Sequence, residues 1–599
     1  MPEFGERTIS RVLIANRGEI ALRVMRACRE LGIATVAVYG PDEETASHVL
    51  YADDAYRLPD AGGIAYLDID AIVAIAKRSG ADAVHPGYGF LSENAAFAAA
   101  VNGAGLIFIG PSPETIGLMG DKIEARRIAV GAGVHPVPGT EDPVQSVDDA
   151  LAWAAEHGYP VAVKAAGGGG GRGFRVARSA TDMQAAFDGS RGEAERYFSN
   201  PTVYLERYLE HPRHIEVQVF GDSHGAVAAF PERDCSIQRR HQKLVEESPS
   251  PAVTPEIRGS LQKAASDLAR SVKYVGAGTV EFLLDDDGSF YFLEMNTRIQ
   301  VEHTVTEMVT GIDLVAEQIR VAMGQPLSFP SVIQAGGWAI ECRLNAEDPA
   351  RQFAPMPGTI TAYREPVGFG IRVESGFAGG GTISPSYDSL VAKLIAWGRT
   401  REEALLRMRR ALGDFQIEGV PTTISFHQKM IDHPAFLNGE ATTMFLGDYP
   451  ELLSNPEAVQ PEPVTHQPAT VSRSITDLIV EVDGRRFSVL VNAPSSEALA
   501  PSRQAERPSR PGKRISKGVN HLSTTGNDLI SSVQGTVLRV AVEEGQVVSQ
   551  GDLIGVVEAM KMENEIAAHR SGRITKLFVA VGESIAAGAN IATIEDVAG

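Results

Sequence analysis

Short apolar runs alternate with longer amphipathic stretches in the first part of the chain. Residues 10–39 read "RVLIAN", then a glycine-bearing turn and "RGEIALRVMRACRELG", then "IATVAVY". Apolar runs bounded by turn residues indicate buried strands, and apolar residues three and four apart indicate a helix. This order predicts a parallel βαβ unit. Because the pattern returns through "ADAVHPG" and "GLIFIG", we expect an open α/β sheet up to about residue 118. Gly18 alone does not make a dinucleotide-binding fingerprint. We therefore expect this unit to form part of the fold without binding a dinucleotide.

The middle of the chain keeps an α/β pattern before its composition changes. Strand-like segments such as "YPVAVKAA", "HIEVQVFG", "GTVEFLL" and "FYFLEMN" recur up to about residue 450. Residues 451–473 are rich in Pro, Glu, Ser and Thr, and residues 475–492 predict a β-hairpin that turns at Asp483-Gly484. Residues 493–527 hold a basic cluster among prolines and serines: Arg503, Arg507, Arg510, Lys513, Arg514 and Lys517. This composition favours a flexible linker whose charges are solvated or dock on an acidic partner.

The last 70 residues contain an internal repeat. Four positions recur 37 residues later: Gly535, Gly545, Gly551 and Glu558 return as Gly572, Gly582, Gly588 and Glu595. Short alternating apolar segments separate the glycines in both copies. Two matching halves of four strands with glycine turns predict a small β-sandwich with pseudo-two-fold symmetry.

Composition and charge narrow the functional class. The chain has 599 residues, of which 43% are hydrophobic and 22% charged, which are ordinary globular values with room for several domains. The formal net charge of -21 argues against a general nucleic-acid binder. Cys28, Cys235 and Cys342 lie too far apart to suggest a disulfide framework or a zinc site. With no signal peptide and no apolar run long enough to span a membrane, we expect a cytoplasmic protein without a membrane partner.

Lys561 lies between two methionines in "EAMKME", at the join of the two repeats. A lysine in an exposed hairpin is usually only solvated, but the apolar Met560 and Met562 are unusual for a turn. The segment resembles the attachment motif of biotinyl carrier domains, which implies covalent biotin on Lys561, attached by a biotin protein ligase. Lipoyl domains share the fold but usually have acidic and small residues beside their lysine, so the two methionines favour biotin. Ser532-Val533 stands where carrier domains usually have Pro-Met before the first repeat glycine, a departure that concerns how the domain docks.

A run of five glycines lies between two strand-like segments in "PVAVKAAGGGGGRGFRVA". Glycine lets backbone N–H groups approach phosphate oxygens closely, and Lys164 and Arg172 add charge; a plain linker is the alternative. No P-loop is present. The arrangement resembles the ATP-grasp fold and, over residues 10–447, biotin carboxylase. The motifs that carry this resemblance are "ANRGEIA", "HPGYGFLSEN", "MGDK", "KAAGGGGGRG", "ERDCSIQRRHQK", "FLEMNTRIQVEH" and "ECRLNAEDP".

A metal site is predicted from spacing. Glu294, Asn296 and Arg298 are two residues apart, so on one extended strand they would share a face. With Glu281 from the "VEFLL" strand, Glu294 and Asn296 offer the oxygen ligands that Mg²⁺, or Mn²⁺, prefers beside nucleotide phosphates. A solvated strand face is the alternative.

The resemblance also implies roles for single residues. The implied ATP-binding residues are Lys122, Lys164, Gly168, Gly169, Gly170, Glu206, Leu209 and His214, with Lys243 near the reacting phosphates. Arg298, Gln300, Val301 and Glu302 match the bicarbonate site, and Tyr88 and Gly89 match the biotin pocket. Glu302 is the implied base that deprotonates bicarbonate as it attacks ATP. Arg343 is implied to stabilise the enolate-like oxygen of biotin; a locally paired structural arginine is the alternative.

These resemblances imply an α/β biotin carboxylase of the ATP-grasp fold, followed by a linker and an all-β carrier. The expected domains are residues 8–118, the ATP-grasp domain 119–331 with its lid at about 136–205, residues 332–450, the linker 451–528 with a small β segment at 475–492, and the carrier 529–597. Segment 475–492 is a candidate subunit-docking element.

No room remains for a carboxyltransferase, so a separate β subunit is the expected partner. The chain would then supply carboxybiotin for acyl-CoA carboxylation, as in actinobacterial acyl-CoA carboxylase α subunits, and biotin carboxylases of this type are commonly homo-oligomers. Membership of a methylcrotonyl-CoA, geranyl-CoA or pyruvate carboxylase complex, and a carrier scaffold with an inactive ATP site, remain alternatives. The sequence does not name the acyl-CoA.

Overall fold

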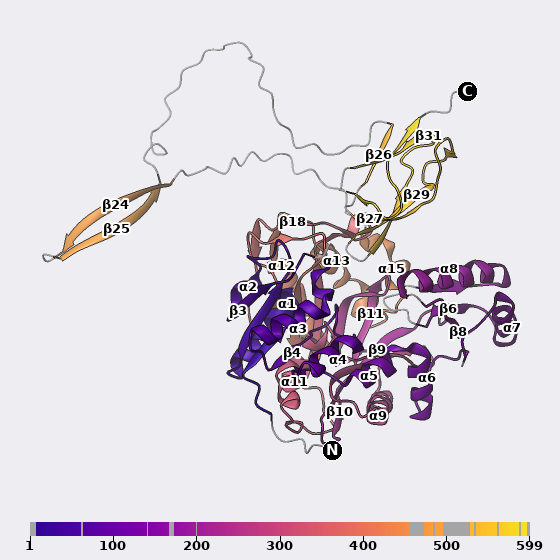
Figure 1. Cartoon of the computed structure of the whole chain (residues 1–599), viewed down its shortest axis with the longest axis horizontal. Helices are drawn as coiled ribbons and strands as arrows, with labels where there is room; N and C mark the ends of the chain where they lie inside the picture. The colour runs from indigo at the N-terminus through magenta and orange to yellow at the C-terminus, as the bar shows by residue number, and fades with distance from the viewer. Residues whose placement is uncertain are drawn as a thin grey trace, which may run out of the picture. The chain divides into compact units, whose positions relative to one another are not determined.

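The computed structural model (Figure 1) describes most of the chain. It covers residues 7–60, 64–140, 142–166, 173–198, 200–453, 473–482, 485–494, 527–531, 535–559, 562–585 and 589–595. None of the helices in these ranges is long and apolar enough to cross a membrane.

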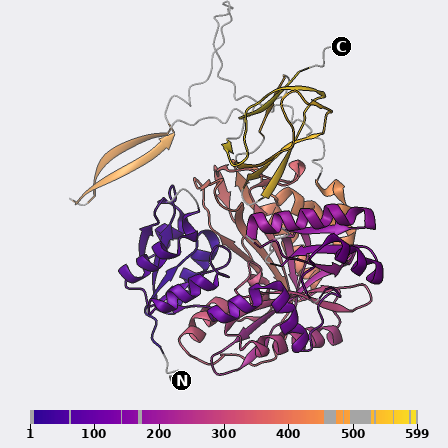
Figure 2. The same cartoon turned by 45° about the vertical axis from the view of Figure 1, so that its right-hand side comes forward.

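The N-terminal part is a parallel five-stranded sheet in the order β3-β2-β1-β4-β5, with helices against it (Figure 2). Side chains alternate across β1, so Val12 and Ile14 face α1 and α11, whereas Leu13 faces α3 and α4. The predicted βαβ unit is confirmed. Its elements are β1 (Arg11–Ile14), α1 (Gly18–Glu30), β2 (Ala34–Tyr39), α2 (Ser47–Tyr51), β3 (Asp54–Arg57), η1 (Ala65–Leu67), α3 (Ile69–Arg78), β4 (Ala83–His85), α4 (Ala95–Gly103), β5 (Ile107–Phe108) and α5 (Pro113–Gly120).

A small antiparallel sheet in the order β7-β6-β8 follows, and α8 packs against it. The two strands β6 and β7 flank the glycine run, whose residues 167–172 lie outside the described ranges. The elements are α6 (Lys122–Gly131), α7 (Val147–His157), β6 (Val161–Ala165), β7 (Phe174–Ala177), α8 (Ala180–Phe198) and β8 (Val203–Arg207).

A nine-stranded antiparallel sheet forms the centre, in the order β14-β13-β9-β11-β12-β15-β22-β20 with β10 beside β9. The strands β12 and β15 join segments of the chain on both sides of residue 331, so one sheet carries residues of two expected domains. Its strands are β9 (Arg213–Gly221), β10 (Val227–Ala229), β11 (Arg233–Arg239), β12 (Gln242–Ser248), β13 (Gly276–Leu284), β14 (Phe290–Asn296), β15 (Trp338–Asn345), β20 (Ile371–Ser375) and β22 (Leu390–Gly398).

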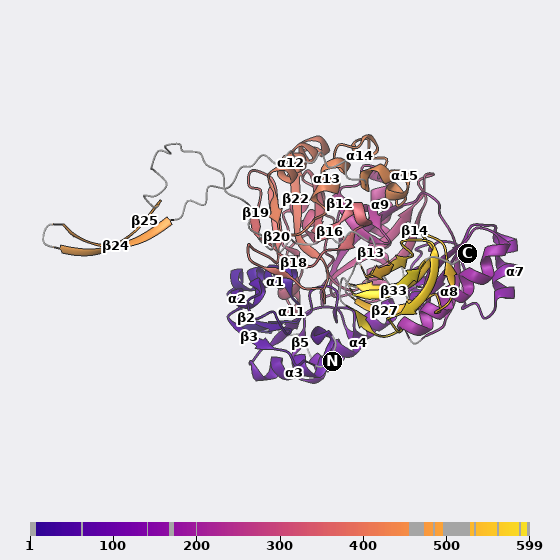
Figure 3. The same ribbon diagram turned by 90° about the horizontal axis from the view of Figure 1, so that it is seen from above.

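Helices and short strands complete this part, with α12 packed on β22 and β15 (Figure 3). The helices are α9 (Pro255–Ser271), α10 (His303–Thr310), α11 (Leu314–Ala322), η2 (Pro349–Arg351), α12 (Arg401–Asp414), α13 (Ile424–Met430), α14 (Pro434–Leu437), α15 (Phe445–Asp448) and η3 (Pro450–Leu453). The short strands are β16 (Glu347–Asp348), β17 (Ala354–Pro355), β18 (Gly358–Thr359), β19 (Ala362–Arg364), β21 (Thr382–Ile383) and β23 (Gln416–Glu418).

Residues 455–527 form a separate unit in which β24 (Arg473–Val482) and β25 (Arg485–Pro494) pair antiparallel. Val482 lies opposite Arg485, so the hairpin predicted at 475–492 is present. Its predicted turn residues, Asp483 and Gly484, and the basic cluster lie outside the described residues.

The C-terminal part contains two four-stranded sheets, β26-β33-β31-β28 and β30-β29-β27-β32. The strands are β26 (Asp528–Ile530), β27 (Gly535–Val540), β28 (Val547–Val548), β29 (Leu553–Ala559), β30 (Met562–Ala567), β31 (Gly572–Leu577), β32 (Ser584–Ile585) and β33 (Asn590–Glu595). They enclose one apolar core.

Backbone hydrogen bonds cross reciprocally between the two repeats of this sandwich. Gly545 N donates to the carbonyl of Ile574, and Gly582 N donates to the carbonyl of Val537. Each donor and acceptor of the first bond lies 37 residues from its counterpart in the second. Gly545 and Gly582 both have positive φ values, 89° and 88°, which glycine adopts without strain. The predicted pseudo-two-fold sandwich is confirmed.

Candidate active site

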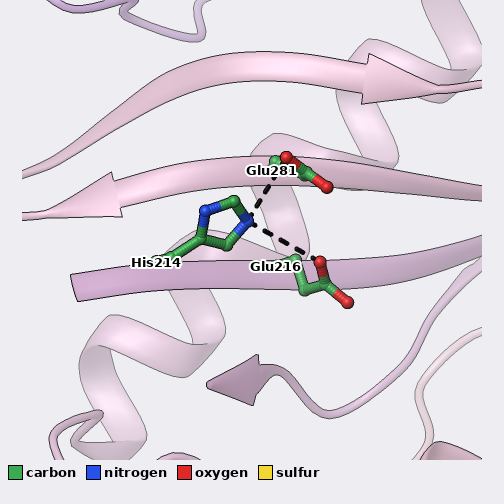
Figure 4. A group of neighbouring side chains, drawn as sticks. All are labelled: His214, Glu216 and Glu281. Carbon is green, nitrogen blue, oxygen red and sulfur yellow. Dashed lines mark ion pairs between the residues drawn. The ribbon is translucent and has the colours of Figure 1, made fainter. Parts of the chain in front are cut away.

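One row of the central sheet carries three carboxylates side by side. Glu281 on β13 lies opposite Glu294 on β14 and Glu216 on β9, and Glu216 lies opposite Arg233 on β11. Like charges on neighbouring strands repel, so this row requires cations against it. Arg233 is fully buried and forms an ion pair with Glu216. Figure 4 shows His214, also on β9, pointing between Glu216 and Glu281.

Lys243 on β12 supplies the central cation. Its Nζ contacts Glu216, Glu281 Oε1 at 3.0 Å and Glu302 Oε1 at 2.7 Å. Glu302 is fully buried and directly precedes α10. Burial raises the pKa of Glu302, but Lys243 and Arg343 outweigh that effect, so its pKa lies below that of a free glutamate. Glu302 is therefore ionised at neutral pH and can accept a proton.

Arg343 on β15 joins Glu302 to a further buried carboxylate. Its Nη2 donates to Glu302 Oε2 at 2.9 Å, and its Nε donates to Glu246 Oε1 at 2.6 Å. Two carboxylates hold the guanidinium in one orientation, because a planar fork bonds best when both arms are engaged. Burial raises the pKa of Glu246 to about 7, against the opposing effect of Arg343.

Arg298 lies beside the row of carboxylates. Its Nε donates to Glu93 Oε2 at 2.8 Å, its Nη1 to Gln300 Oε1 at 2.6 Å and its Nη2 to Asn296 Oδ1 at 3.1 Å. Gln300 in turn donates from Nε2 to Glu281 Oε1 at 3.1 Å. Arg298 and Gln300 therefore belong to the same polar network as Glu281.

The end of β14 departs from the predicted alternation. A bulge between the pairs Glu281/Glu294 and Phe282/Phe292 leaves Leu293 as an extra residue, so both Phe292 and Met295 enter the core. The prediction that Arg298 continues the strand is wrong, because β14 ends at Asn296. Arg298 nevertheless returns to the same site, because its guanidinium binds the side chain of Asn296.

Two further lysines lie at the other end of the row. Lys122 Nζ lies 2.8 Å from Glu294 Oε2. Burial raises the pKa of Glu294, but Lys122 outweighs it and brings the pKa to about 2. Lys164 on β6 pairs with Glu206, which also pairs with Arg126. The backbone N of Lys122 donates to the carbonyl of Ala166, which places the end of β6 beside Lys122.

His214 is held as a cation in this surrounding. Burial lowers its pKa, but Glu281, whose Oε2 lies 3.2 Å from Nε2, outweighs burial and raises the pKa to about 9.

The other described residues that the resemblance implies lie in three places: Tyr88 and Gly89 for biotin, Val301 for bicarbonate and Leu209 for ATP. Tyr88 follows β4 and donates its hydroxyl to Glu19, and Gly89 is exposed with φ 68°. The carbonyl of Val301 accepts a hydrogen bond from Lys393 Nζ at 2.8 Å. Leu209 is buried, 5% exposed, after β8.

Some expected site residues lie outside the described ranges. They are Gly168, Gly169 and Gly170, the anchor Lys561 with its neighbour Met560, and the Ser532-Val533 pair. The strands around Lys561 are described, and Ala559 on β29 pairs with Met562 on β30. Lys561 is thus one of the two residues that connect these strands.

Sequence reasoning missed several residues that the structure adds to the site, namely Glu93, Glu216, Arg233 and Glu246. A usable signal existed for Glu216, a lone carboxylate between apolar neighbours in "HIEVQVFG" two residues after His214. Glu93 lies over 200 positions from Arg298, and no local pattern links them.

The residues expected to hold a metal fit that role. Glu281 and Glu294 are register partners, and Asn296 lies two residues after Glu294 on β14, so the three offer hard oxygen donors on one face of the sheet. Lys122 and Lys243 lie against the same carboxylates, as expected where a site concentrates negative charge for a cation and phosphates.

Four family models match in chain order. They are biotin carboxylase N-terminal domain at residues 8–116, carbamoyl-phosphate synthase L chain ATP binding domain at 121–329, biotin carboxylase C-terminal domain at 341–448 and biotin-requiring enzyme at 527–594.

Among solved structures, the biotin carboxylase domain dimer of Hydrogenobacter thermophilus 2-oxoglutarate carboxylase, in complex with MgADP, ADP and bicarbonate, has a TM-score of 0.74. It is 48% identical and covers 75% of this chain and 100% of its own. The similarity therefore extends over the whole of that domain.

Curated relatives agree. Biotin carboxylase 1 of Bacillus subtilis is 52% identical over 74% of this chain and 99% of its own length. A pyruvate carboxylase component of Methanothermobacter thermautotrophicus is 51% identical over 74% of this chain and 90% of its own. The biotin-dependent acyl-coenzyme A carboxylase alpha3 subunit of Mycobacterium leprae is 44% identical over 99% of this chain and 100% of its own. The chain therefore belongs to the biotin-dependent acyl-CoA carboxylase α subunits, in which an ATP-grasp biotin carboxylase, a ligase, is joined to a biotin carrier domain.

Proposed function

We propose that the chain uses ATP and bicarbonate to carboxylate biotin on its own carrier domain, at Lys561. The observation that carries this proposal is the junction at Lys243. One ammonium contacts both Glu302, the proposed base, which also pairs with Arg343, and Glu281, one of the proposed metal ligands. The proposed proton acceptor and the proposed metal site are thus bridged by a single side chain, that of Lys243.

Bicarbonate binds between Arg298 and Glu302. A guanidinium recognises a planar oxyanion through two parallel hydrogen bonds, and Gln300 holds Arg298 in place for this role. Glu302 removes the proton of bicarbonate as its oxygen attacks the γ-phosphate of ATP, which forms carboxyphosphate and ADP. The low pKa of Glu302 ensures that the base is ionised before substrate binds.

Glu281, Glu294 and Asn296 would hold Mg²⁺, or Mn²⁺, which would supply positive charge against the nucleotide phosphates during phosphoryl transfer. Further positive potential around the same phosphates comes from the side chains of Lys122, Lys164 and His214. The backbone N–H groups of Gly168, Gly169 and Gly170 are proposed to add to it. Glu206 and Leu209 lie where the nucleoside binds.

Biotin, when bound, would supply the ureido nitrogen that receives CO₂ after carboxyphosphate breaks into CO₂ and phosphate, and this phosphate would take the proton from the nitrogen. Arg343 then faces the ureido oxygen and stabilises the negative charge that develops there, while Glu302 and Glu246 keep its guanidinium oriented. Tyr88 and Gly89 form the neighbouring wall of the pocket.

A separate carboxyltransferase β subunit transfers the carboxyl group to an acyl-CoA. The full-length similarity to an acyl-coenzyme A carboxylase subunit supports this acceptor. A pyruvate carboxylase complex is the second candidate, favoured by the similarity to a pyruvate carboxylase component. Purification of the native complex, followed by assays with acetyl-, propionyl- and longer acyl-CoA and with pyruvate, separates them.

Self-association is also part of the proposal. Val367 and Phe369, before β20, are 79% and 76% exposed, and the Phe369 ring lies against Trp397 and Arg407. Exposed large apolar side chains that adjoin each other are typical of a contact surface. The related 2-oxoglutarate carboxylase domain is described as a dimer.

The test of the carboxylase activity is ATP cleavage by the purified chain with free biotin. We expect cleavage that requires bicarbonate and rises with biotin. ATP cleavage without any dependence on bicarbonate, or its complete absence, would overturn the proposal and favour a carrier scaffold.

A further inference from the structure

Lys393 is a fully buried lysine on β22, the strand next to the edge strand β20 of the central sheet. It lies on β22 opposite Arg343 of β15 and opposite Glu374 of β20. An ammonium is almost never fully buried unless specific partners compensate its lost hydration. The groups that Lys393 contacts therefore indicate which parts of the structure it holds in place.

The ammonium has two partners from different parts of the chain. Nζ donates to the carbonyl of Val301 at 2.8 Å, and it lies 3.1 Å from Glu19 Oε1. Glu19 stands in the first turn of α1 and is itself buried. The same oxygen of Glu19 accepts the hydroxyl of Tyr88. Glu19 and Lys393 thus form one chain of contacts from Tyr88 to Val301.

Both ends of this chain of contacts belong to the proposed substrate site. Val301 directly precedes Glu302, the proposed base, in the turn that leads into α10. A hydrogen bond to the Val301 carbonyl orients the peptide before Glu302 and the backbone between Gln300 and Glu302. Tyr88, at the other end, is proposed to lie beside biotin. Neither Lys393 nor Glu19 needs to touch a substrate to influence both places.

We propose that Lys393 and Glu19 are positioning residues: their buried ion pair holds the Val301–Glu302 turn for bicarbonate and Tyr88 for biotin. This inference rests on the proposed function. A purely structural pair would stabilise the contact between α1 and β22 without affecting substrate binding. The two roles are distinguished by the KM values for bicarbonate and biotin, which change only if the pair positions the substrate site.

Lys393→Met in the full chain keeps the length of the side chain and removes the donor to Val301. We expect the KM for bicarbonate in ATP cleavage to rise at least about tenfold while the KM for ATP stays within about twofold, since small displacements of reacting groups cost large factors. Glu19→Gln keeps the shape of Glu19 and weakens its hold on Tyr88. In this variant we expect the KM for free biotin to rise more than the KM for bicarbonate.

Arg401→Met is the matched control. Arg401 on α12 forms a largely buried pair with Glu247 of β12, at 2.7 Å. We expect it to lower the melting temperature as Lys393→Met does, with unchanged KM values. The double variant Glu19→Gln/Lys393→Met removes both charges together, so it avoids leaving one uncompensated in the core.

Three results would overturn the inference. The first is a folded Lys393→Met or double variant whose KM for bicarbonate is that of the wild type. The second is an equal rise of that KM in Arg401→Met. The third is loss of the fold in both Lys393 variants, which would make the pair structural. Failure of the proposed function is distinguishable, because then the wild type itself shows no bicarbonate-dependent ATP cleavage.

Discussion

The ammonium of Lys243 lies 2.7 Å from Glu302 Oε1 and 3.0 Å from Glu281 Oε1. One side chain from β12 therefore connects the proposed base to the proposed metal ligands of β13 and β14. It also keeps the Glu302 carboxylate ionised in a fully buried position. Substitution of Glu302 is therefore the most direct test of the proposed chemistry.

Glu302→Gln should lower bicarbonate-dependent ATP cleavage by about 10²–10⁴-fold, the range for loss of a general base. The amide keeps the shape but accepts no proton from bicarbonate at neutral pH. Steady-state ATP cleavage measures the effect, and nucleotide binding should persist. Glu247→Gln, which alters a buried carboxylate paired with Arg401, is the control and should retain most activity. A Glu302→Gln enzyme with wild-type turnover would remove Glu302 from the mechanism.

Glu281→Gln and Glu294→Gln should each raise the Mg²⁺ concentration needed for half-maximal ATP cleavage, because each removes a charged oxygen ligand. A Mg²⁺ titration at saturating ATP measures this, and chelation of the metal should abolish wild-type activity. Glu232→Gln, at a buried carboxylate paired with Arg258, should leave the titration unchanged. Equal curves for all variants would place the metal elsewhere.

Lys561→Arg should abolish biotin loading and carboxylation of acyl-CoA in the native complex, while carboxylation of free biotin continues. The guanidinium keeps the positive charge but cannot form the amide to biotin. Streptavidin blotting and the two carboxylation assays measure the outcome. Lys576→Arg, on β31 of the same sandwich, is the control and should load normally. Loss of free-biotin carboxylation in Lys561→Arg would contradict the modular organisation.

The stability of the chain should fall as the pH rises above neutrality because of Glu341. Burial raises the pKa of Glu341 to about 8 against the attraction of Lys393, and Glu246, its register partner, raises it further. The folded state then holds a proton that the unfolded glutamate releases above its ordinary pKa of 4.5. The stability that this proton contributes is fully present below 4.5 and is lost as the pH rises through about 8.

Melting temperatures between about pH 6 and pH 9 at fixed ionic strength test this. Glu341→Gln carries a permanently neutral group, so its melting temperature should depend less on pH and exceed that of the wild type at the alkaline end. Parallel curves for the two proteins would show that Glu341 does not titrate in this range.

Phe369→Asp should weaken self-association, because a carboxylate would have to be buried in the contact. Sedimentation velocity over a range of concentrations measures it. Leu50→Asp replaces another exposed apolar side chain, 72% exposed on α2, and should leave the sedimentation coefficient unchanged. A Phe369→Asp protein that sediments as the wild type does would exclude this surface.

Features that depend on local pattern could be predicted from the amino-acid sequence. The glycine repeat predicted a pseudo-two-fold sandwich, because positive-φ turns recur at matching positions and each half needs the other to bury its apolar face. The βαβ start, the hairpin at 475–492 and the shared face of the proposed metal ligands Glu294 and Asn296 also followed from periodicity. The family motifs identified the ligase and its carrier.

Which charged side chains contact each other depends on the folded arrangement of the strands and helices. Lys393 and Val301 are 92 residues apart, and they meet because α10, which begins just after Val301, packs against β15 and β22. Glu246 and Glu341 are neighbours because they are register partners on β12 and β15. The bulge at Leu293 changes which side chains of β14 face the core, and strict alternation did not predict this change. Buried charges must find partners wherever the strand order places them, so the catalytic network depends on topology more than on local sequence.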